Sequence, residues 1–240
     1  DMKRTATRTV GDLDALRRAY QSGRIVNGGG GLASTAVIDL RDYNDQTVAG
    51  DIHTKIHSFS IRERLRRANG NIDNHVMWTK GASSAEAFDA MDSWLRAVKA
   101  DDSDRTLAQK IRADRPADLK DACWANGLKY EEEQTAFGNG ACNTFYPAGT
   151  TPRMAAGGPL TDDIAKCQLK PLDPADYAVS FTAQQWTRLG AVFPEGVCDW
   201  TKPGVGQQPL AGTWLSFGPS PVNLLFDITG LITASVLQQQ

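Results

Sequence analysis

The stretch Ser34-Thr-Ala-Val-Ile-Asp-Leu40, with the polar loop 41–57 that follows it, decides the fold prediction for this chain. The seven residues form a short, β-branched apolar run after the flexible segment 27–31, which is typical of a buried parallel strand. Helix and strand patterns then alternate as far as Leu95. This alternation predicts a doubly wound α/β sheet, in which functional residues lie in loops at the carboxyl ends of strands. The loop 41–57 is therefore the first candidate for a site.

Local patterns predict the elements around this loop. The apolar spacing of residues 12–21 indicates a short helix, and residues 75–79 read as a second strand. Two capping boxes, Ser60-x-x-Glu63 and Ser83-x-x-Glu86, are expected to open helices, the first of which ends at Asn69-Gly70. The apolar face expected for the helix after Ser83 consists of Phe88, Met91, Leu95 and Val98.

Composition sets limits on the class of protein. The chain has 240 residues, of which 41% are hydrophobic and 22% charged, as in ordinary globular domains. A formal net charge of −2 gives no indication of a nucleic-acid or anionic-membrane partner. No apolar run approaches the ~20 residues that span a bilayer. The chain opens with Asp1-Met2-Lys3 and no leader pattern, so we expect a cytosolic protein or a processed product.

The four cysteines all lie in the second half of the chain, at positions 123, 142, 167 and 198. They show no C-x-x-C spacing, which argues against a zinc site and a thioredoxin-type motif. An even number in a Gly- and Pro-rich region favours two disulfides, with three possible pairings, over free buried thiols. Disulfides in turn favour an exported protein. The change of composition after about residue 101 predicts a domain boundary at 102/103.

The loop after the first predicted strand carries the candidate catalytic residues. In hydrolases built on doubly wound sheets, the order along the chain is nucleophile, acid, base. Asp45 lies where the acid of this order is expected, and Asp42 is close by. The base would normally follow the next strand, but residues 80–84 contain no histidine, so His53 is the candidate imidazole, with His57 second. The alternative is a set of solvated loop charges in which Asp51 caps a turn.

The sequence gives weaker signals for a metal site or a phosphate-binding loop. His53 and His57 share a helical face, and with Asp51 they could form a metal pair, but no third ligand and no H-E-x-x-H pattern accompanies them. His75 opens a strand and is expected to be a packing or edge residue. Gly28–Gly31 precedes a strand instead of following one, unlike a phosphate loop. We therefore expect no metal and no cofactor.

The nucleophile is missing from this sequence, because no G-x-S-x-G occurs anywhere in it. If the protein is a hydrolase, the serine is expected upstream of Asp1 or on another chain. The tryptophans and tyrosines of the second half could stack on a sugar or aromatic ligand, although such residues more often fill the core of a disulfide-stapled domain.

Several segments carry a family resemblance. Gly28-Gly-Gly-Gly-Leu32, Ile38-Asp-Leu-Arg-Asp-Tyr43, Gly50-Asp-Ile-His53, Asp73-Asn-His-Val-Met-Trp78 and Cys198-Asp-Trp-Thr-Lys-Pro-Gly-Val-Gly-Gln-Gln208 are the segments concerned. Over roughly residues 5–217 the chain resembles the carboxyl-terminal part of a tannase-like family of bacterial exported proteins of unknown function. The resemblance implies an α/β-hydrolase fold, longer members with an upstream serine nucleophile, and the triad acid at Asp45.

Together these features predict the carboxyl-terminal part of an α/β-hydrolase-type sheet (1–102), a loop-rich, disulfide-stapled extension (103–217) and a tail (218–240). The expected activity is that of a secreted or periplasmic serine esterase acting on a polyester, oligomer or phenolic ester, with Asp45 orienting His53. Its expected partners are the ester substrate and the amino-terminal part of the same precursor, with no nucleic acid and no membrane. The alternative is a non-catalytic, secreted polymer-binding or structural module.

Overall fold

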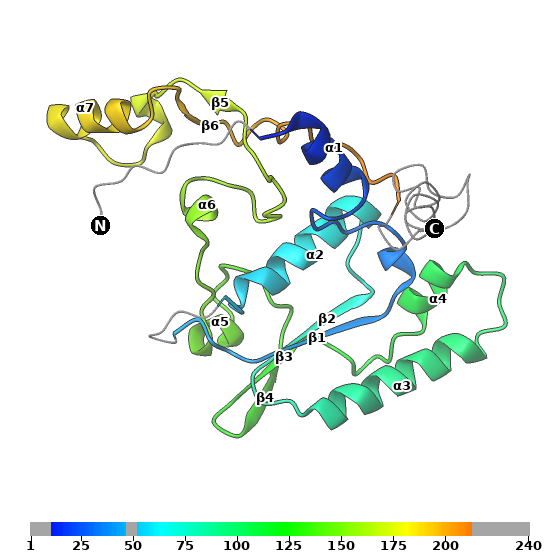
Figure 1. Ribbon diagram of the computed structural model, residues 1–240. Helices are drawn as coiled ribbons and strands as arrows, with labels where there is room; N and C mark the ends of the chain where they lie inside the picture. Colours follow the sequence, from blue (N-terminus) through cyan, green and yellow to red (C-terminus); the bar gives the residue numbers. More distant parts are fainter. Residues whose placement is uncertain (1–10, 47–51, 213–240) are drawn as a thin grey trace, which may run out of the picture. The chain divides into compact units, whose positions relative to one another are not determined.

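A computed structural model describes residues 11–46 and 52–212, and the chain divides into two compact units (Figure 1). One unit is continuous, from Asn27 to Asp162. The other combines the segment up to Val26 with the segment from Asp163 onward. The predicted tail 218–240 lies outside the described residues. The candidate site belongs to the continuous unit, which is described first.

A four-stranded sheet in the order β1-β2-β3-β4 is the centre of the 27–162 unit. Strand β1 (Val37–Arg41) pairs in parallel with β2 (His75–Thr79), from Val37 opposite His75 to Arg41 opposite Thr79. Strand β2 pairs in parallel with β3 (Ala122–Ala125), and β3 pairs antiparallel with β4 (Leu128–Glu131). The mostly parallel sheet with helices on both faces confirms the predicted α/β class.

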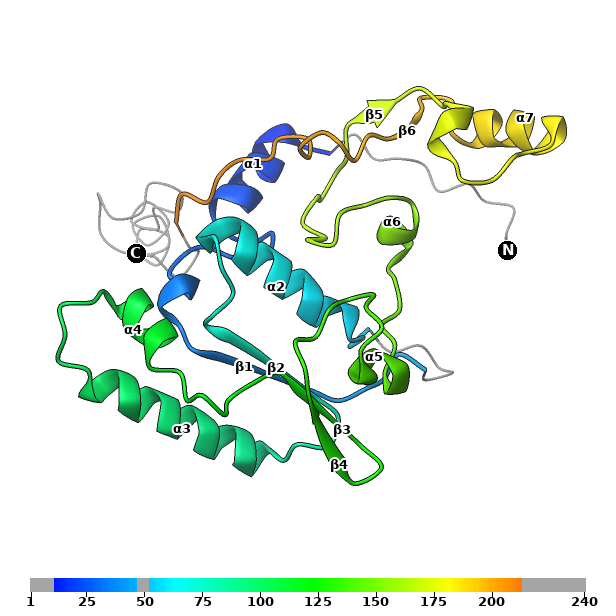
Figure 2. The same cartoon turned by 180° about the vertical axis from the view of Figure 1, so that it is seen from behind.

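Helices cover the two faces of this sheet in separate groups (Figures 1 and 2). Helix α2 (Ile56–Asn69) lies on one face, and α3 (Ser84–Ala100) and α4 (Leu107–Ala113) lie on the other. The unit also contains η1 (Leu32–Ser34), α5 (Ala141–Phe145) and α6 (Pro152–Ala155). Strands β3 and β4 follow residue 103 but belong to the same sheet as β1 and β2; the domain boundary at 102/103 stays a prediction.

The α3 face holds the larger apolar core, in which Trp94 of α3 is fully buried against Val76 and Trp78 of β2. The capping box predicted at Ser83 is confirmed, because Ser83 and Glu86 exchange both of its hydrogen bonds. The expected apolar face is wrong in part. Val98 is buried, but 73% of Phe88 and 47% of Leu95 remain exposed. The side chain that turns inward is Trp94, which buries more apolar area than either of these residues could.

The α2 face differs, because charged groups are buried there next to a small apolar cluster of Ile56, Phe59 and Met77. Helix α2 ends at Asn69, as predicted, and Gly70 follows as its C-cap with a positive φ of 76°. It begins at Ile56, however, one turn before the predicted capping box. Ser60 is buried inside the helix and donates to the carbonyl of Ile56, while Glu63 pairs with Arg66. Burial of Ile56 and Phe59 decides where the helix starts.

A network of charged side chains fills the space between α2 and the sheet. Arg62 of α2 donates to both carboxylate oxygens of Asp121 and, through Nε, to Nδ1 of His75 at 3.2 Å. The Asp121 carboxylate also accepts the backbone N–H groups of Met77 and Gln134. These bonds compensate for burying the ion pair, as a buried pair requires. His75 is therefore a packing residue, as expected for the start of this strand.

The second unit contains α1 (Leu13–Gln21), β5 (Leu169–Lys170), η2 (Pro174–Asp176), α7 (Ala183–Val192) and β6 (Val197–Cys198). Helix α1 has Asp12 as its N-cap, and the hydroxyl of Tyr20 accepts the backbone N–H of Ala165. Strands β5 and β6 pair antiparallel. All four cysteines form disulfides, which confirms the prediction and gives the pairing as Cys123–Cys142 and Cys167–Cys198.

Candidate functional site

The candidate site lies where the parallel strands β1 and β2 end. Asp42 directly follows β1, and its carboxylate pairs at 3.1 Å with Lys80, which directly follows β2. This hydrogen bond to Lys80, together with one from the backbone N–H of Tyr43, lowers the pKa of Asp42. Both side chains are largely exposed, so the pair contributes little to stability.

Asp45 lies farther along the same loop and is held by two segments of the chain. Its Oδ1 accepts the backbone N–H of Lys55 at 2.7 Å, and its Oδ2 accepts the backbone N–H of Gly149 at 3.0 Å. The described residues thus supply two of the roughly four donors that an ionised carboxylate can accept. Because each oxygen accepts a bond from a different segment, the orientation of the carboxylate is fixed.

Lys55 is fully buried at the start of α2. Its Nζ donates to the carbonyl of Tyr146 at 2.9 Å, to Oδ1 of Asn143 at 3.1 Å and to the carbonyl of Cys142 at 3.4 Å. Burial lowers the pKa of the Lys55 ammonium to about 8, and the charges of Asp45 and Glu132 oppose part of this effect. Three oxygen acceptors surround the ammonium, so its donors are used within the fold.

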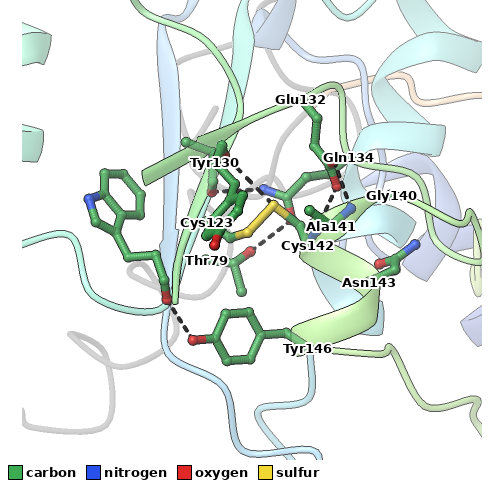
Figure 3. Close-up of a disulfide and its surroundings, with 12 residues drawn as sticks. Thr79, Cys123, Tyr130, Glu132, Gln134, Gly140, Ala141, Cys142, Asn143 and Tyr146 are labelled. Carbon is green, nitrogen blue, oxygen red and sulfur yellow. Dashed lines mark hydrogen bonds between the residues drawn. A yellow bond between two sulfur atoms is a disulfide. The ribbon is translucent and has the colours of Figure 1, made fainter. Parts of the chain in front are cut away.

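The acceptors of Lys55 belong to α5 and the residues just after it (Figure 3). The disulfide Cys123–Cys142 joins α5 to β3, and both cysteines are fully buried. The carboxylate of Glu132 accepts the N–H groups of Ala141 and Cys142 at the start of α5. We call residues 141–149, from α5 to Gly149, the α5 platform.

Aromatic side chains bind the loop after β1 to the α5 platform. The Tyr43 hydroxyl donates to the carbonyl of Pro147 at 2.8 Å, and the rings of Tyr43 and Tyr146 lie 5.1 Å apart. Burial, with the nearby charge of Asp45, raises the pKa of Tyr43. The Tyr146 hydroxyl in turn donates to the carbonyl of Trp124 on β3 at 2.5 Å (Figure 3). The loop that carries Asp45 is thus connected to the sheet through the platform.

His53, the candidate base, lies on the exposed part of the same loop, just before α2. Its carbonyl accepts a bond of 3.4 Å from Nη1 of Arg41, which also donates to the carbonyl of Thr54. Nε of Arg41 donates to the Ser58 hydroxyl at 2.5 Å, so Arg41 ties this part of the loop to α2. His57 is half-buried on α2. Among the described residues, the bonds to the Asp45 carboxylate come from the N–H groups of Lys55 and Gly149 and none comes from the His53 imidazole, so the pairing of Asp45 with His53 stays a prediction.

Within residues 11–46 and 52–212, no group of three or more His, Cys, Asp or Glu side chains is arranged to hold a metal ion. Asp51, the third member of the possible metal set with His53 and His57, lies outside the described residues. No helix in the described part of the chain is long and apolar enough to cross a membrane.

Three important residues of the site were not found by sequence reasoning: Lys55, Asn143 and Gly149. Lys55 looks like an ordinary loop lysine, and the other two lie in a Gly- and Pro-rich region without periodicity. The one relevant signal is the position of Cys142 next to Asn143, since a disulfide fixes its neighbours in place. That signal becomes useful only when the partner cysteine is known.

Comparison with known proteins is informative at the level of the family. Residues 1–209 match the model of a tannase-like family of unknown function. The chain belongs to this family. No curated protein and no solved structure shows a significant match to the chain. The tannase-like family name suggests esterase-type hydrolysis, and it assigns no substrate and no catalytic residue.

Proposed function

We propose that this tannase-like chain is the carboxyl-terminal part of a secreted serine esterase that hydrolyses a carboxylic ester. The substrate class is a polyester, an oligomer or a phenolic ester. A serine from the amino-terminal part of the same precursor, or from a partner chain, attacks the carbonyl carbon. The imidazole of His53 takes the serine proton and later gives it to the leaving alcohol, and the Asp45 carboxylate orients that imidazole.

The observation that carries this proposal is the way in which Asp45 is held. It lies after a parallel strand of an α/β sheet, where acids of hydrolase triads are found. Backbone N–H groups of Lys55 and Gly149 hold both of its oxygens, and these bonds from the described part of the chain leave acceptor positions for an imidazole N–H. A merely solvated loop carboxylate would not need bonds from segments 10 and 104 residues away.

The second candidate function is a non-catalytic polymer-binding module. Three half-buried rings in the second unit favour it: Tyr177 and Phe181, which precede α7, and Trp186, which lies on it, pack within 5.0 to 6.2 Å of one another. Helix α7 buries none of its own residues, so the ring of Trp186 remains partly exposed on it. Half-exposed rings of this kind can stack on sugars or aromatic groups.

The sequence encoded upstream of Asp1 in the same gene separates these two functions. The esterase requires a G-x-S-x-G there or on a co-purifying chain, and a fluorophosphonate probe should label that serine in the native protein. In the unlabelled protein that carries this serine, His53→Ala should lower kcat roughly 10³-fold or more, with His57→Ala as the milder control. Absence of any labelled serine, together with retention on an insoluble polymer, would favour the binding module.

A further inference from the structure

Both backbone N–H groups that bond to Asp45 are connected to the α5 platform, so the platform can fix the positions of both. Gly149 belongs to the platform itself, and its N–H reaches Oδ2 of Asp45. The other donor is the backbone N–H of Lys55, which lies on a different segment. The side chain of that same residue is bound by the platform, through Cys142, Asn143 and Tyr146. Both hydrogen bonds to the Asp45 carboxylate therefore depend on residues 141–149.

The platform has its own anchors to the sheet. The Cys123–Cys142 disulfide and the Tyr146 hydroxyl fix it to β3, and Glu132, just after β4, caps its first N–H groups (Figure 3). A Cβ on Gly140 would come within 2.8 Å of both carboxylate oxygens of Glu132, so glycine at this position lets the carboxylate approach the start of α5. A helix of five residues has little stability of its own, so these anchors decide its position.

We propose that Lys55 is the positioning residue of Asp45. Its ammonium, bound by the disulfide-anchored platform, holds the Lys55 backbone N–H beneath Oδ1 of the carboxylate, while the end of the platform supplies the Gly149 N–H to Oδ2. The catalytic consequence rests on the proposed esterase function; the positioning itself does not. Lys55 would then act on the reaction only through the orientation of Asp45.

The experiment measures amide hydrogen exchange by NMR in the 240-residue chain and its Lys55→Met variant, which keeps the length of the side chain and removes its donors. We expect exchange at Gly149 and at residue 55 to become at least tenfold faster, while the buried strand amides of Val76 and Trp78 stay protected. Lys80→Met is the matched control, because Lys80 pairs with the neighbouring carboxylate of Asp42 and should leave both amides unchanged. Unchanged protection at Gly149, or an equal loss across β2, would overturn the proposal.

A second perturbation covers the case in which Lys55→Met does not fold. The pair Cys123→Ala/Cys142→Ala releases the platform from β3, with Cys167→Ala/Cys198→Ala as the control. Only the first pair should speed exchange at the amides of Gly149 and Lys55; equal effects of the two pairs would overturn the proposal. In the assembled esterase, Lys55→Met should lower kcat with little change in KM. If the amides respond as expected while Asp45→Asn leaves turnover intact, the positioning stands and the proposed function fails.

Discussion

Acidification from pH 7 to pH 5 should destabilise the 27–162 unit, because His75 is buried there as a neutral imidazole. The His75 side chain is 0% exposed, and its Nδ1 accepts a hydrogen bond from Nε of Arg62. A second proton would have to bind at Nδ1, which already faces the N–H donor of Arg62. Burial and the charge of Arg62 lower the pKa of His75 to about 4, and the carboxylates of Asp39 and Asp121 only partly oppose them.

The sign and size of the effect follow from this pKa. An ordinary histidine titrates near pH 6.5, so between about pH 4 and 6.5 the unfolded chain binds more protons than the folded one. The free energy of unfolding therefore falls as the pH drops through this window. The difference between the two pKa values corresponds to about 3 kcal/mol of unfolding free energy in total. About 2 kcal/mol of this is lost between pH 7 and pH 5.

Urea unfolding at pH 7 and at pH 5, followed by tryptophan fluorescence, measures this loss. The His75→Gln variant keeps an acceptor for Arg62 but cannot titrate, so its stability should change about 2 kcal/mol less over this interval than that of the wild type. His57→Gln, on the half-buried part of α2, should follow the wild type. Equal losses in wild type and His75→Gln would refute the assignment of a buried neutral imidazole.

Three further outcomes are expected. Arg62→Met should cost about 3 to 5 kcal/mol of unfolding free energy by chemical denaturation, because it leaves the Asp121 carboxylate buried without its cation; a cost below about 1 kcal/mol would contradict this account. Intact-mass measurement should find no alkylated cysteine in the native protein and four after reduction under denaturing conditions. The 240-residue chain alone should not turn over p-nitrophenyl esters, since it contains no G-x-S-x-G; serine-inhibitor-sensitive turnover by this chain would show that a nucleophile lies within it.

Local signals in the sequence were enough for much of the sheet unit. The strand 75–79, the capping box at Ser83 and the stop at Gly70 each depend on a few adjacent residues, and each is confirmed. The box at Ser60 was a false signal. Burial of the apolar side chains at 56 and 59 outweighed a capping pattern that contributes about 1 kcal/mol.

The candidate site was only partly predictable, for a physical reason. The loop carrying Asp45 follows from the strand that precedes it, but its donor Gly149 lies 104 residues away along the chain. The acceptors of Lys55 lie 87 to 91 residues away. No periodicity or spacing encodes such contacts, because they arise only when the disulfide and the sheet bring α5 to the end of β1.

The most direct test of the proposed function is kcat for an ester substrate in the protein assembled with its nucleophile-bearing part, with Asp45→Asn compared with Asp42→Asn. Both changes remove one negative charge from the loop after β1, but only Asp45 is clamped by two backbone N–H groups. We expect a fall in kcat of roughly 10³-fold or more for Asp45→Asn and less than about tenfold for Asp42→Asn. Wild-type turnover in a folded Asp45→Asn protein would contradict it.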